Sequence, residues 1–365
     1  MKKKATADIL KKTSEELRWK SQPRPTGAIP PAGEDSIGLD PWEIDERTKL
    51  IGLCIDRYKR EFSHRRPASV YHVDEAINHL LTTLQLHENL STDEITKERL
   101  ITYKNALLAG TAPRGPRKRL AKAPTIAKKL SLINAWLKWA TNNGYMDRNP
   151  MDGLALPARL VSSQKVKKSA FLDHQLVTIL AAIAPDKTST KLMRREWYWV
   201  VLCLMFTGAR LSEILQMIHA DVRLVEDIWC FKIEGGPGKQ LKNAVSERVV
   251  PVHSQLIEAG FLDWHHAQQT GERLFPLLLV KRAVKVSHFF AYMLKKQKMK
   301  VPAISLHSFR HTFTQKLVKA RVFPSISRRL LGHAGHDVES RVYEGSLEFS
   351  AKDLAEAVEK VRFPV

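Results

Sequence analysis

The sequence predicts a mainly α-helical protein with a small β-sheet, an α+β chain of two domains behind an amino-terminal arm. Three observations support this fold class. Apolar residues recur at three- and four-residue spacing through both halves of the chain, as on the buried face of a helix. Two short β-rich runs, residues 228–233 and 248–253, are separated by a loop rich in glycine and lysine. A length of 365 residues is enough for two hydrophobic cores.

Composition and spacing place the domain boundaries. Residues 1–43 combine a lysine cluster with prolines and glycines, which predicts a flexible basic arm. Residues 44–157 have helical periodicity and predict a helical domain. Residues 158–170 are rich in serine and lysine, as a linker is. Residues 171–365 form the second domain, which contains the sheet and ends in a helix.

The terminal helix shows its own signals. Ser350 with Asp353 predicts a capping box at its start, and Leu354, Val358 and Val361 form an apolar stripe along it. This stripe needs a partner surface, either on its own domain or on a neighbouring protomer.

The charge of the chain indicates its partner. Lys and Arg number 59 against 38 Asp and Glu, a formal net charge of +21, which is more than solubility requires. We expect nucleic acid and not a membrane, because the basic residues are spread over several segments with the patterns of folded elements. The longest apolar run, Trp197–Phe206, is about half a membrane span and predicts a buried helix. The opening residues lack the apolar stretch of a signal peptide, which predicts a cytoplasmic, nucleoid-associated protein.

A long basic stretch lies in the helical domain. Between Arg99 and Met146 there is no acidic residue, whereas solvated helix faces normally mix both signs. Phosphate contact is therefore favoured over a merely solvated face. The candidate DNA-binding residues are Arg114, Arg117, Lys118, Arg119, Lys122, Lys128 and Lys129.

The second domain contains short sequence fragments whose residue types suit phosphate binding or proton transfer. In TGARLSEIL, a glycine turn precedes Arg210 at a helix start, where a guanidinium can bind a phosphate or simply pair with Glu213. In the glycine-rich hairpin loop, Lys239 or Lys242 could donate a proton to a leaving oxygen. The three cysteines, Cys54, Cys203 and Cys230, are widely spaced among apolar residues and predict reduced core thiols.

Histidines mark the next two fragments. In SLHSFRHTF, His307 and Arg310 lie three residues apart and share one helical face. His307 and His311 also have the spacing of a zinc pair, with His333 or His336 as a third ligand, but the glutamate of that motif is absent. In RRLLGHAGHD, His333 follows a helix end, where it could cap the helix or donate a hydrogen bond.

The last fragment, RVYEG, places Tyr343 ten residues after His333. Taken alone, such a tyrosine is usually a packing residue. In this order, however, the fragments resemble the active-site set of the tyrosine recombinases, the phage integrase family. The resemblance extends to the TGxRxSE phrase, the strand ending in VPVH and the LLGH phrase. It implies a helical core-binding domain followed by a mixed α/β catalytic domain, with these catalytic residues: Arg210, Lys242, His307, Arg310, His333 and Tyr343.

The resemblance also implies a mechanism and partners. Tyr343 would attack a scissile phosphate in double-stranded DNA at a specific site and form a 3′-phosphotyrosyl bond, with no metal or other cofactor. Arg210 and Arg310 would bind the non-bridging oxygens, and Lys242 would protonate the leaving 5′ oxygen. Four protomers would exchange strands through a Holliday junction, with accessory DNA-bending proteins as further partners. This family behaviour favours docking of the terminal helix on a neighbouring protomer.

Two alternatives use the same residues differently. A type IB topoisomerase relaxes supercoiled DNA with the same tyrosine chemistry, and a DNA-binding relative could lack catalysis. Retention of every candidate catalytic residue argues against the second alternative. The sequence leaves open whether integration, excision, resolution or cassette movement is the natural task.

Overall fold

The structure, a computed structural model, describes residues 49–65, 67–113, 120–184, 192–241, 243–268, 272–279, 283–299, 301–333 and 349–365. The chain divides into two compact units, Met1–Gln164 and Lys165–Val365, which we call unit 1 and unit 2 and describe separately. The division falls within the predicted linker 158–170, and the predicted arm 1–43 lies outside the described residues. Among the helices of the described ranges, none is long and apolar enough to cross a bilayer.

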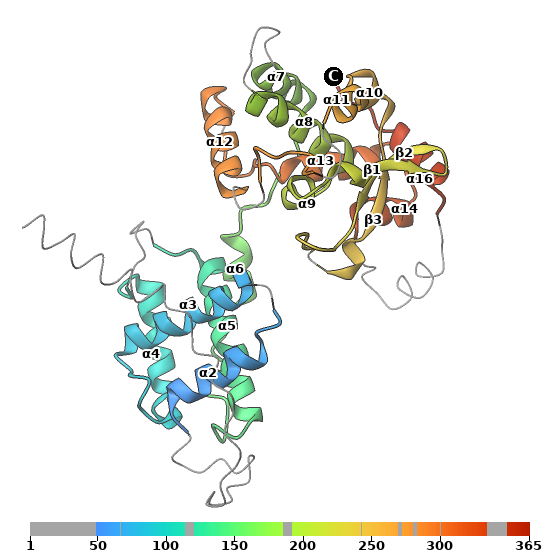
Figure 1. The fold of residues 1–365 in the computed structure, drawn as a ribbon. Coiled ribbons are helices and arrows are strands. Elements are labelled where there is room, and N and C mark those ends of the chain that lie inside the picture. The colour runs from blue at the N-terminus through green and yellow to red at the C-terminus, as the bar shows by residue number, and fades with distance from the viewer. Residues whose placement is uncertain are drawn as a thin grey trace, which may run out of the picture. The chain divides into compact units, whose positions relative to one another are not determined.

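Unit 1 is a group of helices packed around α5 (Figure 1). The elements are α2 (Ile51–Glu61), α3 (Pro67–Leu84), the 3-10 turn η2 (Thr92–Glu94), α4 (Lys97–Ala109), α5 (Ala123–Asn142) and α6 (Ala158–Ser163). Helices α2, α3, α4 and α6 all contact α5. Helix α6 occupies the first part of the predicted linker and belongs to unit 1 through its packing on α5.

The apolar stripe of α5 explains why it lies at the centre. Ile126, Leu130, Ile133, Leu137 and Ala140 are all buried, as their spacing predicts. The lysines of the helix lie off this stripe. One face of α5 therefore holds the core together, and the other is available to solvent or a ligand.

Unit 2 contains a three-stranded antiparallel sheet of order β1-β2-β3. Its strands are β1 (Val222–Val225), β2 (Ile228–Ile233) and β3 (Arg248–Pro251). The register pairs Val222 with Phe231 and Phe231 with Val250, and all three side chains are buried. Since opposed residues share one face of a sheet, this face packs on the core. The expected small sheet in a mainly helical chain is confirmed.

The rest of unit 2 is mainly helical (Figure 1). The described helices are α7 (Asp173–Ile183), α8 (Leu192–Thr207), α9 (Leu211–Leu215), α10 (Ser254–Glu258), α11 (Phe261–His266), α12 (Ala283–Lys296), α13 (Ser308–Lys319), α14 (Pro324–Leu331) and α16 (Ala351–Glu359), with 3-10 turns η3 (His219–Asp221) and η4 (Ala244–Ser246). The apolar run Trp197–Phe206 lies inside α8, which contacts α13 and belongs to the core, as predicted. Cys54, Cys203 and Cys230 are buried thiols, which also confirms their expected role.

The terminal helix α16 corrects one expectation. The predicted capping box is present, since Ser350 Oγ accepts a hydrogen bond from Asp353 N. The stripe of Leu354, Val358 and Val361, however, is buried in the core of unit 2 itself, where α16 packs against β2, β3 and α14. Docking on a neighbouring protomer, which the family resemblance favoured, was therefore wrong for this stripe. Its own domain already removes these side chains from water.

Candidate active site

A glycine turn places Arg210 at the start of α9. Helix α8 ends at Thr207, and Gly208 follows with φ of 60°, a left-handed conformation that glycine adopts without strain. A Cβ at Gly208 would also lie only 2.6 Å from Cδ1 of Phe313 on α13. The turn and the close helix packing thus both require glycine. Arg210 is the N-cap residue of α9.

Arg210 is held by Glu213, one turn along α9. Its Nη1 donates to Oε1 of Glu213 at 2.5 Å, and its backbone N–H donates to Oε2 at 2.9 Å. The Glu213 side chain is 2% exposed, whereas that of Arg210 is 22% exposed. The pairing that the sequence offered as an alternative to phosphate binding is present. It fixes the guanidinium while part of the arginine stays accessible.

Arg310 lies in the first turn of α13 and is almost fully buried. Its Nη1 donates to the carbonyl of Gly208 at 2.8 Å, and its Nη2 donates to the carbonyl of Leu331. Nη2 also donates to Nε2 of His333 at 2.7 Å. Burial, followed by the charge of Arg210, lowers the pKa of Arg310 to about 10, so that it remains cationic at neutral pH. One guanidinium thereby joins the turn before α9 to the end of α14.

His333 owes its position to the end of α14. Gly332 closes that helix in a left-handed conformation with φ of 62°, and the backbone N–H of His333 bonds to the carbonyl of Arg328 at 3.1 Å. Because His333 Nε2 accepts the bond from Arg310, the neutral ring carries its proton on Nδ1. The sequence left capping and function equally open, and the structure connects His333 to Arg310.

His307 precedes α13 by one residue, so it lies one turn before Arg310. Partial burial, then the charges of His311, Arg310 and Arg210, lower the pKa of His307 below its ordinary value. The imidazole is therefore mostly neutral at pH 7. The rings of His307 and His311 are 5.1 Å apart, edge to face. Across the described residues, no group of three His, Cys, Asp or Glu side chains could hold a metal ion, and His336 lies outside them.

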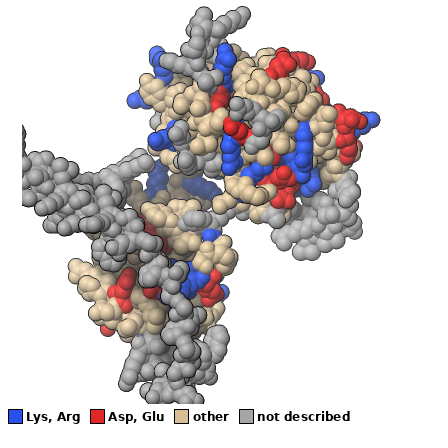
Figure 2. Space-filling view, in the orientation of Figure 1, with Lys and Arg blue, Asp and Glu red and all other residues tan. Residues whose placement is uncertain are grey.

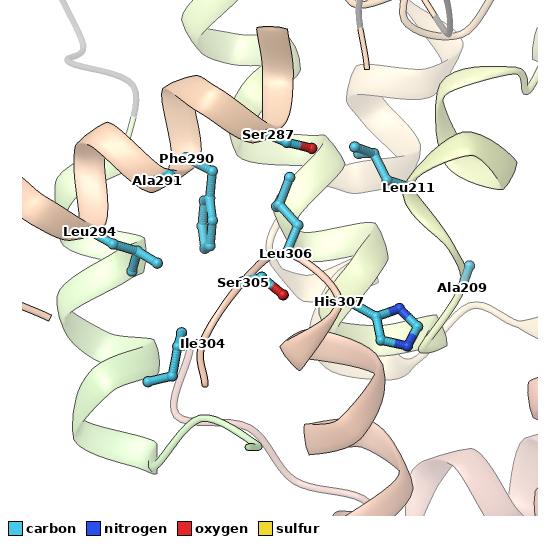
Figure 3. A pocket seen from close by; sticks show the side chains of 10 residues that line it. All are labelled: Ala209, Leu211, Ser287, Phe290, Ala291, Leu294, Ile304, Ser305, Leu306 and His307. Atoms are coloured by element: carbon cyan, nitrogen blue, oxygen red, sulfur yellow. The ribbon is translucent and has the colours of Figure 1, made fainter. Parts of the chain in front are cut away.

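An apolar hollow of about 270 Å³ lies beside His307 (Figure 3). It is formed by α12, the start of α9 and the segment that leads into α13. Phe290, Leu294 and Ile304 line its apolar side, and the His307 ring lies near Ala209 at the other end (Figure 3). Its lining carries no cation, so the hollow is a boundary of the candidate site and not a phosphate-binding part of it.

The structure distinguishes the two hairpin lysines in part. Lys239 Nζ pairs with Asp221 Oδ1 at 2.5 Å, and both side chains are largely buried, at 9% and 4% exposure. Its ammonium is thus engaged in holding the hairpin. Lys242 and Tyr343, the other two catalytic candidates, lie outside the described residues. Lys242 stays the predicted general acid.

Arg248 belongs to this region but is not among the residues that the sequence predicts for the site. Arg248, on β3, has a fully buried side chain, and its Nη2 donates to Glu213 Oε2 at 2.8 Å. The run containing it was interpreted only as a strand. A signal was present: side chains alternate along a strand, so Arg248 shares the inward face of Val250. A cation on a buried face requires a buried partner.

The candidate DNA-binding residues of unit 1 differ in exposure and in ion pairing. Lys122 and Lys128 are exposed, whereas Lys129 pairs with Glu75 of α3 at 3.1 Å. Arg99 likewise pairs with Glu94 at 2.9 Å. The stretch without acidic residues is therefore partly balanced in space by acidic side chains from outside it, and on the face shown in Figure 2 both signs occur in each unit. Arg114, Arg117, Lys118 and Arg119 lie outside the described residues.

Two sequence comparisons relate this chain to known proteins. Residues 170–345 match the model of the phage integrase family, a range that contains all six catalytic candidates. "Tyrosine recombinase XerC" of Pelobacter propionicus is 24% identical over 241 residues, which cover 65% of this chain and 74% of that protein.

Solved structures share the fold. A lambda integrase dimer bound to a COC′ core site has a TM-score of 0.57 at 15% identity, covering 82% of this chain and 79% of that one. The Tn1549 transposon integrase in complex with circular intermediate DNA has a TM-score of 0.58 at 15% identity, covering 84% of this chain and 98% of that one. The class that fold and site define is that of the DNA breakage-rejoining enzymes. Residues 170–345 of the chain therefore form a domain of the phage integrase family, to which the tyrosine recombinases belong.

Proposed function

We propose that this protein is a site-specific DNA recombinase that cuts and rejoins double-stranded DNA through a 3′-phosphotyrosyl intermediate. The observation that carries the proposal is the cluster of cationic and imidazole groups around Arg310. Its guanidinium bonds to the Gly208 carbonyl, two residues before Arg210, and to His333. Two guanidinium groups held in this way suit the two non-bridging oxygens of one phosphodiester.

The proposed reaction has two steps, cleavage and rejoining. The Tyr343 hydroxyl releases its proton to solvent as its oxygen attacks the scissile phosphorus. The bond from phosphorus to the 5′ oxygen breaks, and Lys242 donates a proton to that oxygen. The product is a 3′-phosphotyrosine and a free 5′-hydroxyl. In the second step a 5′-hydroxyl from a partner strand gives its proton back to Lys242 and attacks the phosphotyrosine. The bond from phosphorus to the tyrosine oxygen breaks, and the released tyrosine takes up a proton from solvent. The energy of the phosphodiester is thus retained in the covalent bond and is not lost to water.

The other groups stabilise the charge that develops on the phosphoryl oxygens. Arg210 and Arg310 bind these oxygens, and His307 and His333 donate hydrogen bonds to them in the transition state. His333 suits this role because its Nε2 accepts a hydrogen bond from Arg310, which holds the imidazole beside the guanidinium. The chemistry requires no divalent cation, because arginines, histidines and a lysine supply all the charge.

The assembly is proposed by similarity. A solved lambda integrase tetramer is bound to a Holliday junction. We infer that four protomers of this chain likewise bring two DNA sites together, with accessory DNA-bending proteins as further partners at the sites. The helical unit 1 contacts phosphates through exposed basic residues, including Lys122 and Lys128.

Covalent trapping tests the proposal. The purified protein is mixed with labelled fragments of the DNA on either side of its own gene, denatured with detergent and collected on filters that retain protein. We expect retained DNA with a free 5′-hydroxyl, and sequencing its ends gives the cleavage site. Retention should persist in excess EDTA. The matched control is Tyr343→Phe, which lacks only the nucleophilic oxygen and should bind DNA without retaining it.

Three results would contradict the proposal. An adduct that persists in Tyr343→Phe would assign the nucleophile to another residue. Loss of the adduct in EDTA, restored by zinc, would favour a metal site at His307 and His311. Relaxation of any supercoiled plasmid by the protein as a monomer, without paired sites, would favour a type IB topoisomerase activity.

A further inference from the structure

Arg248 bonds to three different elements from a fully buried position. Its Nη2 donates to Glu213 Oε2 on α9, its Nε to the carbonyl of Leu330 on α14, and its Nη1 to the carbonyl of Ser246 in η4. All three bonds are 2.8 Å long. Desolvating a guanidinium costs several kcal/mol unless its donors are satisfied. The position thus demands a planar cation with donors in three directions, which lysine does not provide.

The first of these bonds leads to Arg210. The Glu213 oxygen that accepts from Arg248 also accepts from the Arg210 backbone N–H, and the other oxygen binds the Arg210 guanidinium. Burial alone would raise the pKa of Glu213, but Arg248 and Arg210 lower it overall, so the carboxylate is ionised. Without Arg248, this buried carboxylate would lose a charged partner, and its hold on Arg210 would change.

The second bond leads to the other half of the site. Leu330 is followed by Leu331, whose carbonyl accepts from Arg310, and then by Gly332 and His333. The fit is close, since a Cβ at Gly332 would lie 3.0 Å from Nη1 of Arg248. Arg248 therefore fixes the end of α14 at the point where it supports both Arg310 and His333.

We propose that Arg248 is a positioning residue that sets Arg210, Arg310 and His333 at one mutual geometry. The proposal rests on the recombinase chemistry proposed above. Arg248 is buried beneath these groups and acts on the scissile phosphate only through them. Its role is to align two guanidinium groups that come from different helices, α9 and α13, with the two oxygens of one phosphate. A misplacement of about 1 Å can reduce a rate about 100-fold.

The test compares two scissile linkages in the DNA site recovered by covalent trapping. The first is the ordinary phosphodiester. The second is a methylphosphonate, in which a methyl group replaces one non-bridging oxygen, so the linkage is neutral and its transition state carries less negative charge. Its cleavage therefore depends less on aligned guanidinium groups. Rates are measured as single-turnover formation of covalent adduct, with each methylphosphonate stereoisomer tested separately.

Arg248→Met is the test variant, and Arg223→Met is its matched control. Arg223 lies on β1 of the same sheet with an exposed side chain, so the same substitution there disturbs no buried bond. We expect Arg248→Met to slow phosphodiester cleavage by up to about 100-fold. On the methylphosphonate, the cleavage rate of Arg248→Met divided by that of wild type should be clearly closer to one. DNA affinity should stay near the wild-type value, and Arg223→Met should match wild type on both linkages.

A second variant separates positioning from folding. Arg248→Met leaves the buried Glu213 with Arg210 as its one cationic partner among the described residues and should lower the Tm. Adding Glu213→Gln neutralises this buried carboxyl and should regain part of the loss. If positioning is the role, the double variant stays slower on the phosphodiester than Glu213→Gln alone, although its Tm recovers. All rates are taken well below the lowest Tm.

The outcomes are distinct. Recovery of the Tm in the double variant, together with phosphodiester cleavage as fast as in Glu213→Gln alone, would overturn the proposal, because Arg248 would then be needed only for stability. Equal slowing of Arg248→Met on both linkages would overturn it as well, since the defect would not involve the phosphate oxygens. A wild-type protein that forms no adduct with any DNA would instead contradict the recombinase function itself.

Discussion

The two units use positive charge in opposite ways. In unit 2, Arg310 and Arg248 are 4% and 3% exposed, and each donates to backbone carbonyls of other segments. In unit 1, Lys122 and Lys128 are exposed on and beside α5. A transition state is stabilised by groups that are already in place when charge develops, whereas the DNA backbone is held by cations that displace its counterions. The first task therefore favours burial and the second favours exposure.

The comparison implies different responses to mutation. Rigid, buried cations should be sensitive to distant changes in packing, because their geometry is their function. Exposed cations should act nearly independently, since each contributes mainly its charge. The following predictions test this contrast, from the largest expected effect to the smallest.

Removing the chain from Ser350 onward should destabilise unit 2 most. The stripe of Leu354, Val358 and Val361 would be lost from its core, at roughly 1.5–3 kcal/mol for each side chain as an upper bound. His253, buried at 0% exposure, would also lose the Val361 carbonyl to which it donates at 2.6 Å. We expect a large fall in the free energy of unfolding of unit 2 and no covalent adduct, measured by urea denaturation and filter trapping.

Unit 1 provides the internal control for this truncation. Its helices make their own core, so weak, sequence-independent DNA binding should remain. An unchanged unfolding midpoint together with lost assembly of protomers on DNA would show that the stripe acts between protomers after all.

Arg310→Met should come next in size. It removes the donor that bonds to Gly208, Leu331 and His333, and with it one of the charges proposed for the phosphate. Loss of a single transition-state donor costs about 100- to 1,000-fold in rate. Single-turnover cleavage should fall by at least this factor, while gel-shift affinity changes little. A loss of affinity as large as the loss of rate would mean that Arg310 binds DNA in the ground state as well.

Most of the candidate site residues could be picked out from the sequence, but the contacts that hold them in place could not. Arg210, His307, Arg310 and His333 stand in short fragments whose order and spacing are visible in the chain. Their bonds depend on tertiary packing that spacing does not encode: Arg310 reaches Gly208 across 102 positions. Arg248 escaped notice for the same reason, because its partners on α9 and α14 are distant in sequence.

The same limit applies to the terminal helix and to the basic stretch. The capping box at Ser350 was readable, but the choice of surface for the stripe was not, because an apolar face fits any complementary surface. The pairing of Lys129 with Glu75, 54 residues away, could not be read from a local count of charges. Periodicity therefore predicts faces, and tertiary structure decides their partners.

Glu196 provides a smaller and pH-dependent test. Burial raises the pKa of this α8 carboxyl from 4.5 to about 7, although the backbone N–H groups of Leu277 and Leu278 oppose the rise. The folded state binds the proton more tightly than the unfolded state. The contribution of this carboxyl to the free energy of unfolding is therefore most favourable below pH 4.5 and is lost as the pH rises to about 7. Glu196→Gln should therefore stabilise the protein at pH 8 by about 1 kcal/mol, after allowance for screening by solvent.

Urea denaturation of Glu196→Gln and wild type at pH 4.5 and pH 8 measures this effect. The difference between the two proteins should be small at the lower pH and appear at the higher. If the variant is less stable than wild type at pH 8, the hydrogen bonds from the two N–H groups to the ionised carboxylate stabilise the protein by more than burial of its charge destabilises it.

The smallest effects are expected for single lysines on unit 1, and they distinguish exposed from paired cations directly. Lys128→Ala should reduce the slope of log affinity against log salt by about 0.9, the value for one phosphate contact, and should do so equally on cognate and unrelated DNA. Lys129→Ala is the matched comparison on the next residue of α5. Its side chain is 15% exposed and its ammonium is already paired with Glu75, so we expect a smaller change in slope. Equal slopes for the two variants, measured by fluorescence anisotropy from low to physiological salt, would mean that DNA binding breaks the pair with Glu75. An unchanged slope for Lys128→Ala would place this face of α5 away from the DNA.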